Sequence, residues 1–387
     1  MESNQSDYTM KEMIAQKLKD QGKDSAHNSD EEENDDQRNS REARQDQKQE
    51  QVIEYSYLGK DCTFDNDAEE IEYSMIYRIP KIENLENCVN LQRLGLRKNL
   101  IKKIEGLDNN LALTHLELYD NRIKIIENIS HLTNLVMLDL SFNRITDISG
   151  LDSLVNLRKL FLASNRISDI SGLDFLVNLE TLDLGDNKLK KIENLDRLYN
   201  LTELYAAKNK LTEISGLDNL KNLMIVALQA NFIQRLSGVD HLESLEELYL
   251  QQNEISKIEG LDSLTNLNTL DLAYNRLEKI EGLDNNFQVT ELWLNYNKIE
   301  DNDSLNYLNR FKKLETIYVA DNPIAKNEHF MDNLQKAVPT LRQIDGYVLR
   351  PGITFKMMQN VNVKPITKKE MNPKVKEILE DVTKMQQ

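Results

Sequence analysis

The stretch LVMLDLSFNRI at residues 135–145 is followed 22 residues later by LRKLFLASNRI at residues 157–167. Both stretches fit the frame L-x-x-L-x-L-x-x-N-x-I/L, and the frame recurs on either side of them with the same 22-residue period. Self-similarity at one short period is the signature of a solenoid, in which like units stack in chain order. The period therefore predicts the architecture before any single motif does.

An asparagine ends the strand portion of the frame in every unit. Ten of these asparagines follow one another at steps of 22 residues, and the eleventh follows after 25. A side-chain amide is both donor and acceptor, so at a bend it can pair backbone groups that would otherwise lack hydrogen bonds. We therefore expect a structural asparagine ladder that consists of Asn99, Asn121, Asn143, Asn165, Asn187, Asn209, Asn231, Asn253, Asn275, Asn297 and Asn322.

The frame resembles the leucine-rich repeat and predicts an α/β leucine-rich-repeat solenoid. The L-x-L alternation indicates a short strand, and equal strands stacked in chain order are parallel, which gives a curved parallel sheet on the concave face. About eight residues per unit remain for the convex face, so 3₁₀ or short helical turns are expected there. Seven residues after the ladder asparagine, nine units have Gly or Asn, which predicts a left-handed backbone conformation at that position.

Composition divides the chain into four parts. Residues 1–70 contain 20 acidic and 9 basic residues and are expected to form a disordered acidic tail. The solenoid, a half-repeat cap plus eleven repeats, is expected at residues 71–321, with no strand in the half-repeat. A C-terminal cap is expected at residues 322–350, and a partly ordered basic tail at residues 351–387.

The charge limits the classes of partner and the location of the chain. A net charge of −17 disfavours nucleic acids and anionic membranes as partners. No apolar run approaches the ~18 residues of a membrane span, and no N-terminal stretch has the pattern of a secretory signal, so a soluble intracellular protein is expected. Ser29 precedes Asp30, Glu31, Glu32 and Glu33, a context that acidophilic kinases accept, so Ser29 is a candidate phosphorylation site.

The side chains that folding does not explain lie at the third, fifth and seventh frame positions, which point out of the concave sheet. At the fifth position five of eleven residues are aromatic and four are acidic. Tyr and Trp carry much of the binding energy at protein interfaces. The alternative reading, that aromatic residues simply favour strands, leaves the interleaved carboxylates unexplained. The concave face is therefore predicted to bind a protein.

The sequence offers little for catalysis. The five histidines are scattered over the chain, and no cluster of Cys, His and carboxylates has metal-ligand spacing. The phosphate-binding loop, the dinucleotide-binding turn and the nucleophile elbow are not found. We expect neither an enzyme nor a metal or other cofactor.

The repeats ISGLDSLVNL at residues 148–157 and LYLQQNEISKIEGLDSLTNL at residues 248–267, together with Trp293, Tyr318 and the cap, resemble the regulatory subunit 7 family of protein phosphatase 1. The resemblance covers roughly residues 70–350. It implies a non-catalytic subunit of the nucleus and cytoplasm that binds the phosphatase catalytic subunit and controls its activity, maturation or localisation. It leaves open whether a third regulatory subunit joins.

In that family, concave aromatic and acidic side chains hold the catalytic subunit. By position the resemblance gives this role to Asp139, Phe161, Asp183, Tyr205, Asp271, Glu291, Trp293 and Tyr318, and Tyr249 joins them through its place at the fifth frame position. The alternative is a leucine-rich-repeat scaffold of cytoskeletal (axonemal) or ribonucleoprotein assemblies.

Overall fold

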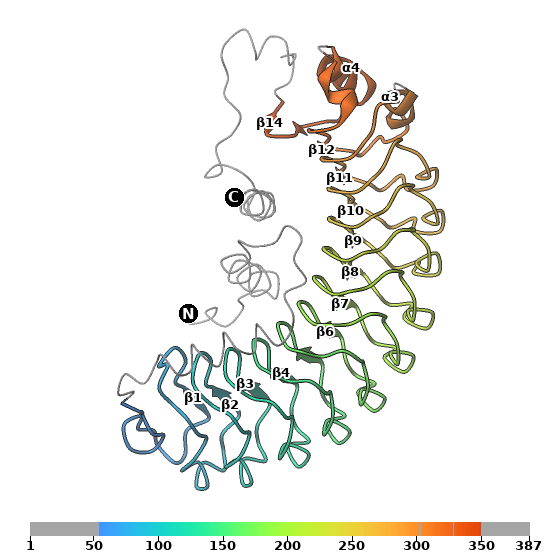
Figure 1. Ribbon diagram of the computed structural model, residues 1–387. Coiled ribbons are helices and arrows are strands. Elements are labelled where there is room, and N and C mark those ends of the chain that lie inside the picture. Colours follow the sequence, from blue (N-terminus) through green and yellow to red (C-terminus); the bar gives the residue numbers. More distant parts are fainter. Residues whose placement is uncertain (1–53, 302, 328, 350–387) are drawn as a thin grey trace, which may run out of the picture. The chain divides into compact units, whose positions relative to one another are not determined.

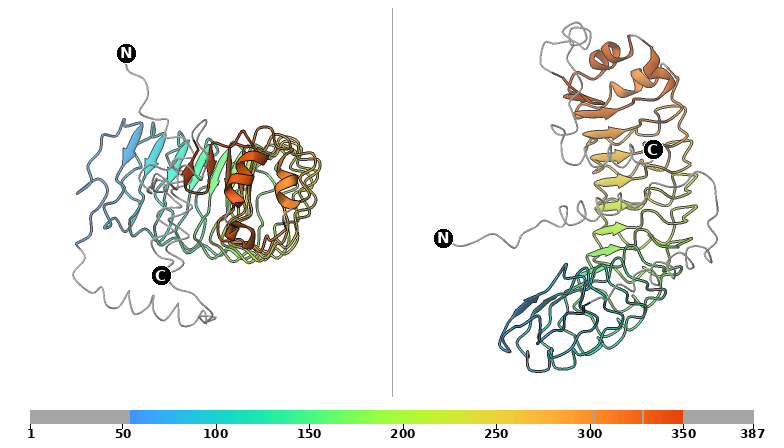
Figure 2. Two further views of the ribbon diagram at one scale, coloured as in Figure 1. Left: turned by 90° about the horizontal axis from the view of Figure 1, so that it is seen from above. Right: turned by 60° about the vertical axis from the view of Figure 1, so that its left-hand side comes forward.

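The computed structural model describes residues 54–349 except 302 and 328. The parts of the predicted tails at residues 1–53 and 351–387, with Ser29, lie outside the described residues. From residue 54 the chain winds into a solenoid whose coils each contribute one short strand, and the strands line the concave side (Figures 1 and 2). The fold is the predicted leucine-rich-repeat solenoid with a parallel sheet and few helices.

The strands recur with the period of the sequence. Strands β1 to β13 pair in parallel in chain order. They are β1 (Glu70–Glu72), β2 (Arg93–Gly95), β3 (His115–Glu117), β4 (Met137–Asp139), β5 (Lys159–Phe161), β6 (Thr181–Asp183), β7 (Glu203–Tyr205), β8 (Ile225–Ala227), β9 (Glu247–Tyr249), β10 (Thr269–Asp271), β11 (Glu291–Trp293), β12 (Thr316–Tyr318) and β13 (Gln343–Ile344).

The core is a stack of leucines from equivalent frame positions. Leu138, Leu160 and Leu182 stand opposite one another in neighbouring strands and are fully buried. Burying one such side chain stabilises the fold by about 1.5–3 kcal/mol. Because each coil buries its leucines against the two adjacent coils, the repeats hold one another in register.

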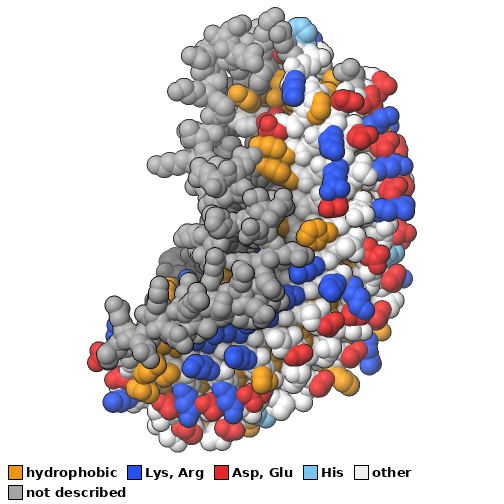
Figure 3. Space-filling view, viewed as in Figure 1, with side chains coloured by type: hydrophobic (Ala, Val, Ile, Leu, Met, Phe, Trp, Pro, Cys, Tyr) orange, Lys and Arg blue, Asp and Glu red, His pale blue; other side chains and the backbone are white. Residues whose placement is uncertain are grey.

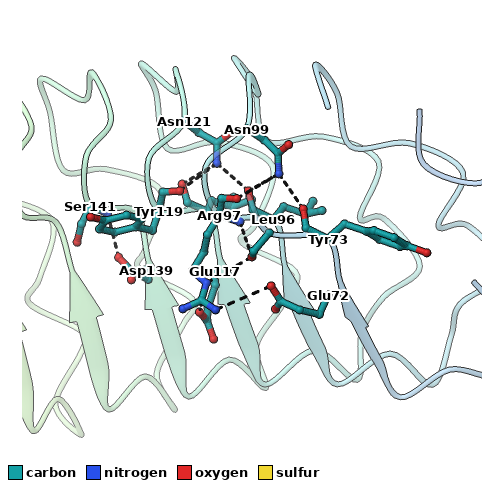
Figure 4. A network of polar contacts seen from close by, with 12 residues as sticks. Glu72, Tyr73, Leu96, Arg97, Asn99, Glu117, Tyr119, Asn121, Asp139 and Ser141 are labelled. Atoms are coloured by element: carbon teal, nitrogen blue, oxygen red, sulfur yellow. Dashed lines mark hydrogen bonds and ion pairs between the residues drawn. The ribbon is translucent and has the colours of Figure 1, made fainter. Parts of the chain in front are cut away.

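The ladder asparagines tie each coil to the one before it. In Asn121, Oδ1 accepts a hydrogen bond from the Ile101 N–H at 3.0 Å, and Nδ2 donates to the carbonyls of Leu96 at 2.9 Å and Leu118 at 3.1 Å (Figure 4). Equivalent bonds recur at every ladder position from Asn99 to Asn322. All eleven side chains are buried. The ladder is thus part of the backbone hydrogen bonding of the solenoid.

The convex side consists of short turns and carries a second asparagine ladder. The turns close with hydrogen bonds between residues three apart, such as Leu132 N–H to the Ile129 carbonyl at 2.9 Å. The second ladder was not among the predicted features, although an Asn-Leu pair recurs every 22 residues in much of this region. Its side chains donate to the carbonyl 23 residues earlier, at 2.7–2.9 Å, in Asn134, Asn156, Asn178, Asn200, Asn222 and Asn266.

The predicted left-handed position is confirmed in all nine units. Its glycines have φ between 66° and 77°, and Asn128 and Asn194 have φ of 58°. A Cβ atom on Gly216 would lie 2.3 Å from the Ile192 carbonyl oxygen. In Asn194 the side-chain Nδ2 donates to the equivalent carbonyl, that of Ile170, at 2.7 Å. Asparagine can therefore occupy this position because its side-chain amide forms a hydrogen bond with the nearby carbonyl oxygen of the preceding coil.

Replacement of Gly216 tests this explanation. We expect Gly216→Ala to lower the free energy of unfolding by about 1–3 kcal/mol, because the methyl group meets a carbonyl oxygen at positive φ. Gly216→Asn should cost clearly less, because its amide can donate to Ile192. Urea titration followed by circular dichroism measures both, and equal losses would contradict the role given to the asparagine side chain.

The solenoid begins earlier than predicted. Residues 54–69 precede a strand, β1, in the half-repeat that was expected to have none, so the described solenoid includes residues that were predicted to belong to the acidic tail. Ile71 stands opposite Leu94 and is buried, and Leu58 is fully buried before it. The sequence Glu-Ile-Glu lacks the leucines of the frame, which is why the pattern missed the strand.

Helices appear where the period breaks. The 25-residue step between Asn297 and Asn322 accommodates α3 (Asp303–Leu308), which was not predicted. The predicted cap contains η1 (Pro323–Lys326) and α4 (Phe330–Ala337), with β13 and β14 (Tyr347–Val348) after them. The Asp345 carboxylate accepts hydrogen bonds from the N–H groups of Val319 at 2.7 Å and Ala320 at 2.9 Å, groups that have no further coil to pair with.

Candidate partner-binding face

The fifth frame position forms a continuous row on the sheet, which we name the central column. Neighbours in the row stand opposite each other in adjacent strands from Gly95 to Tyr318. The column consists of Gly95, Glu117, Asp139, Phe161, Asp183, Tyr205, Ala227, Tyr249, Asp271, Trp293 and Tyr318. Eight of the nine predicted binding residues belong to it, and Glu291 lies two residues before Trp293 in β11. The structure thus places all nine in two adjacent rows.

The three aspartates of the central column have a local structural role that the sequence did not indicate. One carboxylate oxygen of each accepts the backbone N–H two residues later: Asp139 from Ser141 at 3.0 Å, Asp183 from Gly185 at 2.9 Å, and Asp271 from Ala273 at 2.9 Å. This bond holds the chain as it leaves the strand, as an Asx turn does. Aspartate at this position therefore stabilises the backbone turn after the strand and also contributes negative charge to the concave face.

Asp271 differs from the other two because of its second oxygen. Oδ2 is buried and has no hydrogen-bond partner in the part of the chain that the structure describes, and the whole side chain is inaccessible to solvent. Burial raises the pKa of this carboxyl to about 7, against the opposing effect of the Ala273 N–H. Near neutral pH the carboxyl thus lies close to the midpoint of its titration.

This shift predicts a stability that depends on pH. The folded state holds a proton between the unfolded pKa of ~3.9 and the folded value near 7, so Asp271 lowers the free energy of unfolding as the pH rises through this range, by at most about 4 kcal/mol. Asp271→Asn should remove that part of the pH dependence while keeping an acceptor for Ala273. Urea titrations at pH 5 and pH 8 measure it, and an unchanged pH dependence in the variant would refute the assignment.

The aromatic members of the column are packed against their neighbours. The hydroxyls of Tyr205 and Tyr249 donate to Glu203 at 3.3 Å and Glu247 at 2.7 Å, and burial raises the pKa of both phenols. The rings of Trp293 and Tyr318 lie 4.9 Å apart at an interplanar angle of 38°. Phe161, Trp293 and Tyr318 are buried. Nε1 of Trp293 has no hydrogen-bond partner within the described residues.

The charge of the face changes sign along the solenoid. In β2, β3 and β5 the first strand residue is Arg93, His115 or Lys159, and burial together with the two cations lowers the pKa of His115. The corresponding residues of β7, β9 and β11 are Glu203, Glu247 and Glu291. A partner of mixed charge would therefore be oriented along the sheet.

The basic end also holds an ionic network, shown in Figure 4. The Arg97 guanidinium lies between two carboxylates, 3.3 Å from Glu117 and 3.9 Å from Glu72, and the Arg97 N–H donates to the Ser74 hydroxyl at 3.0 Å. The network joins the first three strands of the sheet. Among residues 54–349 other than 302 and 328, no group of three His, Cys, Asp or Glu could hold a metal ion, and no helix is long and apolar enough to cross a membrane.

Comparison with known proteins identifies the repeat. The family model described as Leucine Rich repeats (2 copies) matches residues 112–153, 155–197 and 243–285. The matched segments are leucine-rich repeats. No protein with a curated description matches the sequence. Leucine-rich repeats form a protein-interaction scaffold, and no enzyme family is indicated.

Several solved structures resemble this leucine-rich-repeat chain. An internalin from Listeria monocytogenes is 25% identical, with a TM-score of 0.61 over 74% of this chain and 88% of that one. A leucine-rich-repeat protein from Leptospira interrogans is 24% identical, with a TM-score of 0.57 over 68% and 75% of the two chains. The ectodomain of a receptor kinase from Arabidopsis thaliana, crystallised with CASPARIAN STRIP INTEGRITY FACTOR 2, is 24% identical, with a TM-score of 0.57 over 75% and 37%. These likenesses concern the fold.

Proposed function

We propose that this chain is a non-catalytic regulatory subunit that binds the catalytic subunit of protein phosphatase 1 with its concave face. It would control the activity, maturation or localisation of that enzyme in the nucleus and cytoplasm. The observation that carries the proposal is the single row of aromatic and acidic side chains on the sheet. The order of these side chains along the row resembles that of the regulatory subunit 7 family. Leucine-rich repeats form a protein-interaction scaffold, and this row runs along the sheet on the concave face.

Two neighbouring groups in the row favour a polar as well as an apolar contact. Asp271 and Trp293 stand opposite each other in β10 and β11. The Asp271 Oδ2 and the Trp293 Nε1 are, respectively, an acceptor and a donor without hydrogen bonds in the described chain. Both atoms are buried in the described chain, and buried polar groups cost free energy unless they are paired, so a partner whose docking opens access to these two atoms and pairs them gains from both. The glutamates at the same end favour a basic surface on that partner.

Titration of the full chain with the isolated phosphatase catalytic subunit, followed by calorimetry, tests the proposal. We expect one-to-one binding with Kd below about 1 μM, which corresponds to ~8 kcal/mol. The absence of heat and of co-elution at 10 μM of each protein would refute it.

Co-purification followed by mass spectrometry separates the proposal from its alternative. A phosphatase catalytic subunit among the captured proteins supports it, and a further protein that depends on that subunit would identify the third component. Dynein and tubulin components, or spliceosomal proteins, captured in place of the phosphatase would support the scaffold reading.

A further inference from the structure

We propose a second interaction surface, on the flank of the solenoid where each convex turn leads back to the sheet, that binds a basic amphipathic helix of a partner protein. Its centre is the residue four positions before the strand in five successive coils, and we name it the apolar row. The inference does not depend on the identity of the concave-face partner. The row consists of Leu111, Thr133, Val155, Val177 and Tyr199.

The four apolar members of the row are open to solvent. Between 37% and 55% of their surface is exposed, and Phe175, two residues before Val177, adds a ring that is 52% exposed. On the face that Figure 3 shows, charged side chains of both signs line the outer edge of the solenoid, and hydrophobic side chains lie among them in the lower coils. Single exposed apolar residues are ordinary, but a set of them on neighbouring coils is typical of an interaction site.

The second asparagine ladder fixes the position of the row. The carbonyl of each row residue accepts a hydrogen bond from the side-chain amide of the next coil, as Val155 does from Asn178 and Val177 does from Asn200, both at 2.9 Å. Successive row residues therefore follow the stacking of the coils, which is about 4.8 Å per coil at the sheet, and the row spans roughly 20 Å.

The fold does not require apolar side chains at this position. In the three coils after Tyr199 the same position holds Lys221, Glu243 and Thr265. The Glu243 carbonyl accepts the side-chain amide of Asn266 at 2.9 Å, which is the same contact that the apolar coils make. Because a charged residue permits the same backbone contact, the exposed apolar side chains between Leu111 and Tyr199 are better explained by binding.

An acidic row runs beside the apolar row, three residues earlier in each coil. The turns there close with hydrogen bonds between residues three apart, as Leu154 N–H to the Leu151 carbonyl at 2.9 Å, and side chains three apart in such turns lie over one another. Within residues 54–349 other than 302 and 328, the four carboxylates of this acidic row have no ion pair. They are Asp108, Asp152, Asp174 and Asp196.

The spacing of the row favours a helix as its occupant. Side chains three or four apart on a helix have Cβ atoms about 5–6 Å apart, which is close to the coil spacing of about 4.8 Å. Side chains on one face of an extended strand are about 6.6 Å apart and fall out of step with the coils. A row of roughly 20 Å matches a helix of about 14 residues.

The acidic row determines the charge of that helix. Lys and Arg along one edge of its apolar stripe would lie against the carboxylates, which gives both affinity and one orientation. An anionic membrane or a nucleic acid would be repelled by the same carboxylates. A second copy of this chain would bring its own acidic row to the surface. The combination of an apolar and an acidic row therefore fits a basic amphipathic helix.

The test uses the full chain and a fluorescein-labelled helical peptide of about 14 residues, with Leu at every third or fourth position and Lys beside each Leu. Fluorescence anisotropy should show saturable binding of this peptide and none of a peptide with Glu in place of Lys. Val177→Ser with Tyr199→Ser should weaken binding about tenfold or more. The matched control, Ile125→Ser with Phe232→Ser, removes two exposed apolar side chains outside the row and should change Kd by less than about threefold.

A second pair of variants tests the acidic row at fixed charge change. Asp152→Asn with Asp174→Asn should weaken binding about fivefold or more, because these carboxylates lie beside apolar members of the row. Asp240→Asn with Asp262→Asn makes the same change at the same position of coils where the row is polar, and should stay within about twofold. These substitutions alter exposed side chains, so they decide the matter even where the serine variants lose stability.

Other results would overturn the proposal. Absence of saturable binding, equal binding of the Lys and Glu peptides, or equal losses in the row variants and their controls would each do so. Self-association of the chain that the serine variants abolish, without peptide binding, would assign the row to a second copy. Binding to vesicles of phosphatidylcholine and phosphatidylserine that depends on the row, without peptide binding, would assign it to a membrane. Circular dichroism of every variant shows whether it is folded.

Discussion

Trp293→Ala should weaken binding of the phosphatase catalytic subunit by roughly 30- to 1000-fold. Truncation of a central interface aromatic typically costs ~2 to 4 kcal/mol of binding free energy, and each 1.4 kcal/mol is about a factor of ten. Trp293 lies between Asp271 and Tyr318 in the central column, and its indole N–H has no partner in the described chain. The variant removes both the ring contact and this donor. Calorimetric titration of the catalytic subunit gives the dissociation constants.

The effect on binding has to be separated from an effect on folding, because the Trp293 ring packs against Tyr318. The binding titration is therefore run at a temperature well below the melting temperature of each protein. Phe287→Ala is the matched control, since Phe287 is an aromatic residue six positions earlier that is 53% exposed. Its dissociation constant should stay within twofold of that of the wild type. A Trp293→Ala protein with unaltered affinity would remove the central column from the proposed interface.

Repetition made much of the fold predictable. One frame of eleven residues places a strand, a buried leucine and a ladder asparagine, and a parallel stack then gives every coil the same surroundings. That is why the row from Asp139 to Tyr318 could be assembled from sequence positions alone. The left-handed position seven residues after the ladder asparagine was also predictable, because Gly and Asn adopt positive φ more readily than most other residues.

The features that were not predicted depend on contacts made by residues outside the repeating leucine and asparagine positions, or on burial that the sequence pattern does not reveal. Strand β1 was not predicted because its one buried side chain is Ile71, which lies between two glutamates and does not fit the leucine frame. Helix α3 was not predicted because an insertion of three residues shows only that the period is broken. Formation of the helix depends on the burial of Ser304 and Leu308 in the folded chain. The Asp271 carboxyl looks like a surface charge in the sequence, and its raised pKa arises from burial in three dimensions.

Asn187→Ala should lower the free energy of unfolding by about 3 kcal/mol. In the folded chain the Asn187 Oδ1 accepts the Ile167 N–H at 3.0 Å, and its Nδ2 donates to the carbonyls of Leu162 at 3.0 Å and Leu184 at 3.1 Å. All of these groups are buried, and a buried N–H without a partner costs about 1–3 kcal/mol by itself. The loss lies in mid-solenoid, where both neighbouring coils depend on the contact, so it should affect cooperative unfolding of the stack.

A matched control comes from the same coil. Asn178 belongs to the second ladder and donates to the Val155 carbonyl at 2.9 Å, but this bond is exposed to solvent. Because water can replace the amide there, Asn178→Ala should cost about 0.5 kcal/mol or less. Urea titration compares the two variants, and hydrogen exchange at the Ile167 amide reports the local opening. Equal losses of stability in both variants would contradict the internal structural role of the first ladder. Full stability of Asn187→Ala together with loss of partner binding would show that the first ladder is a binding surface.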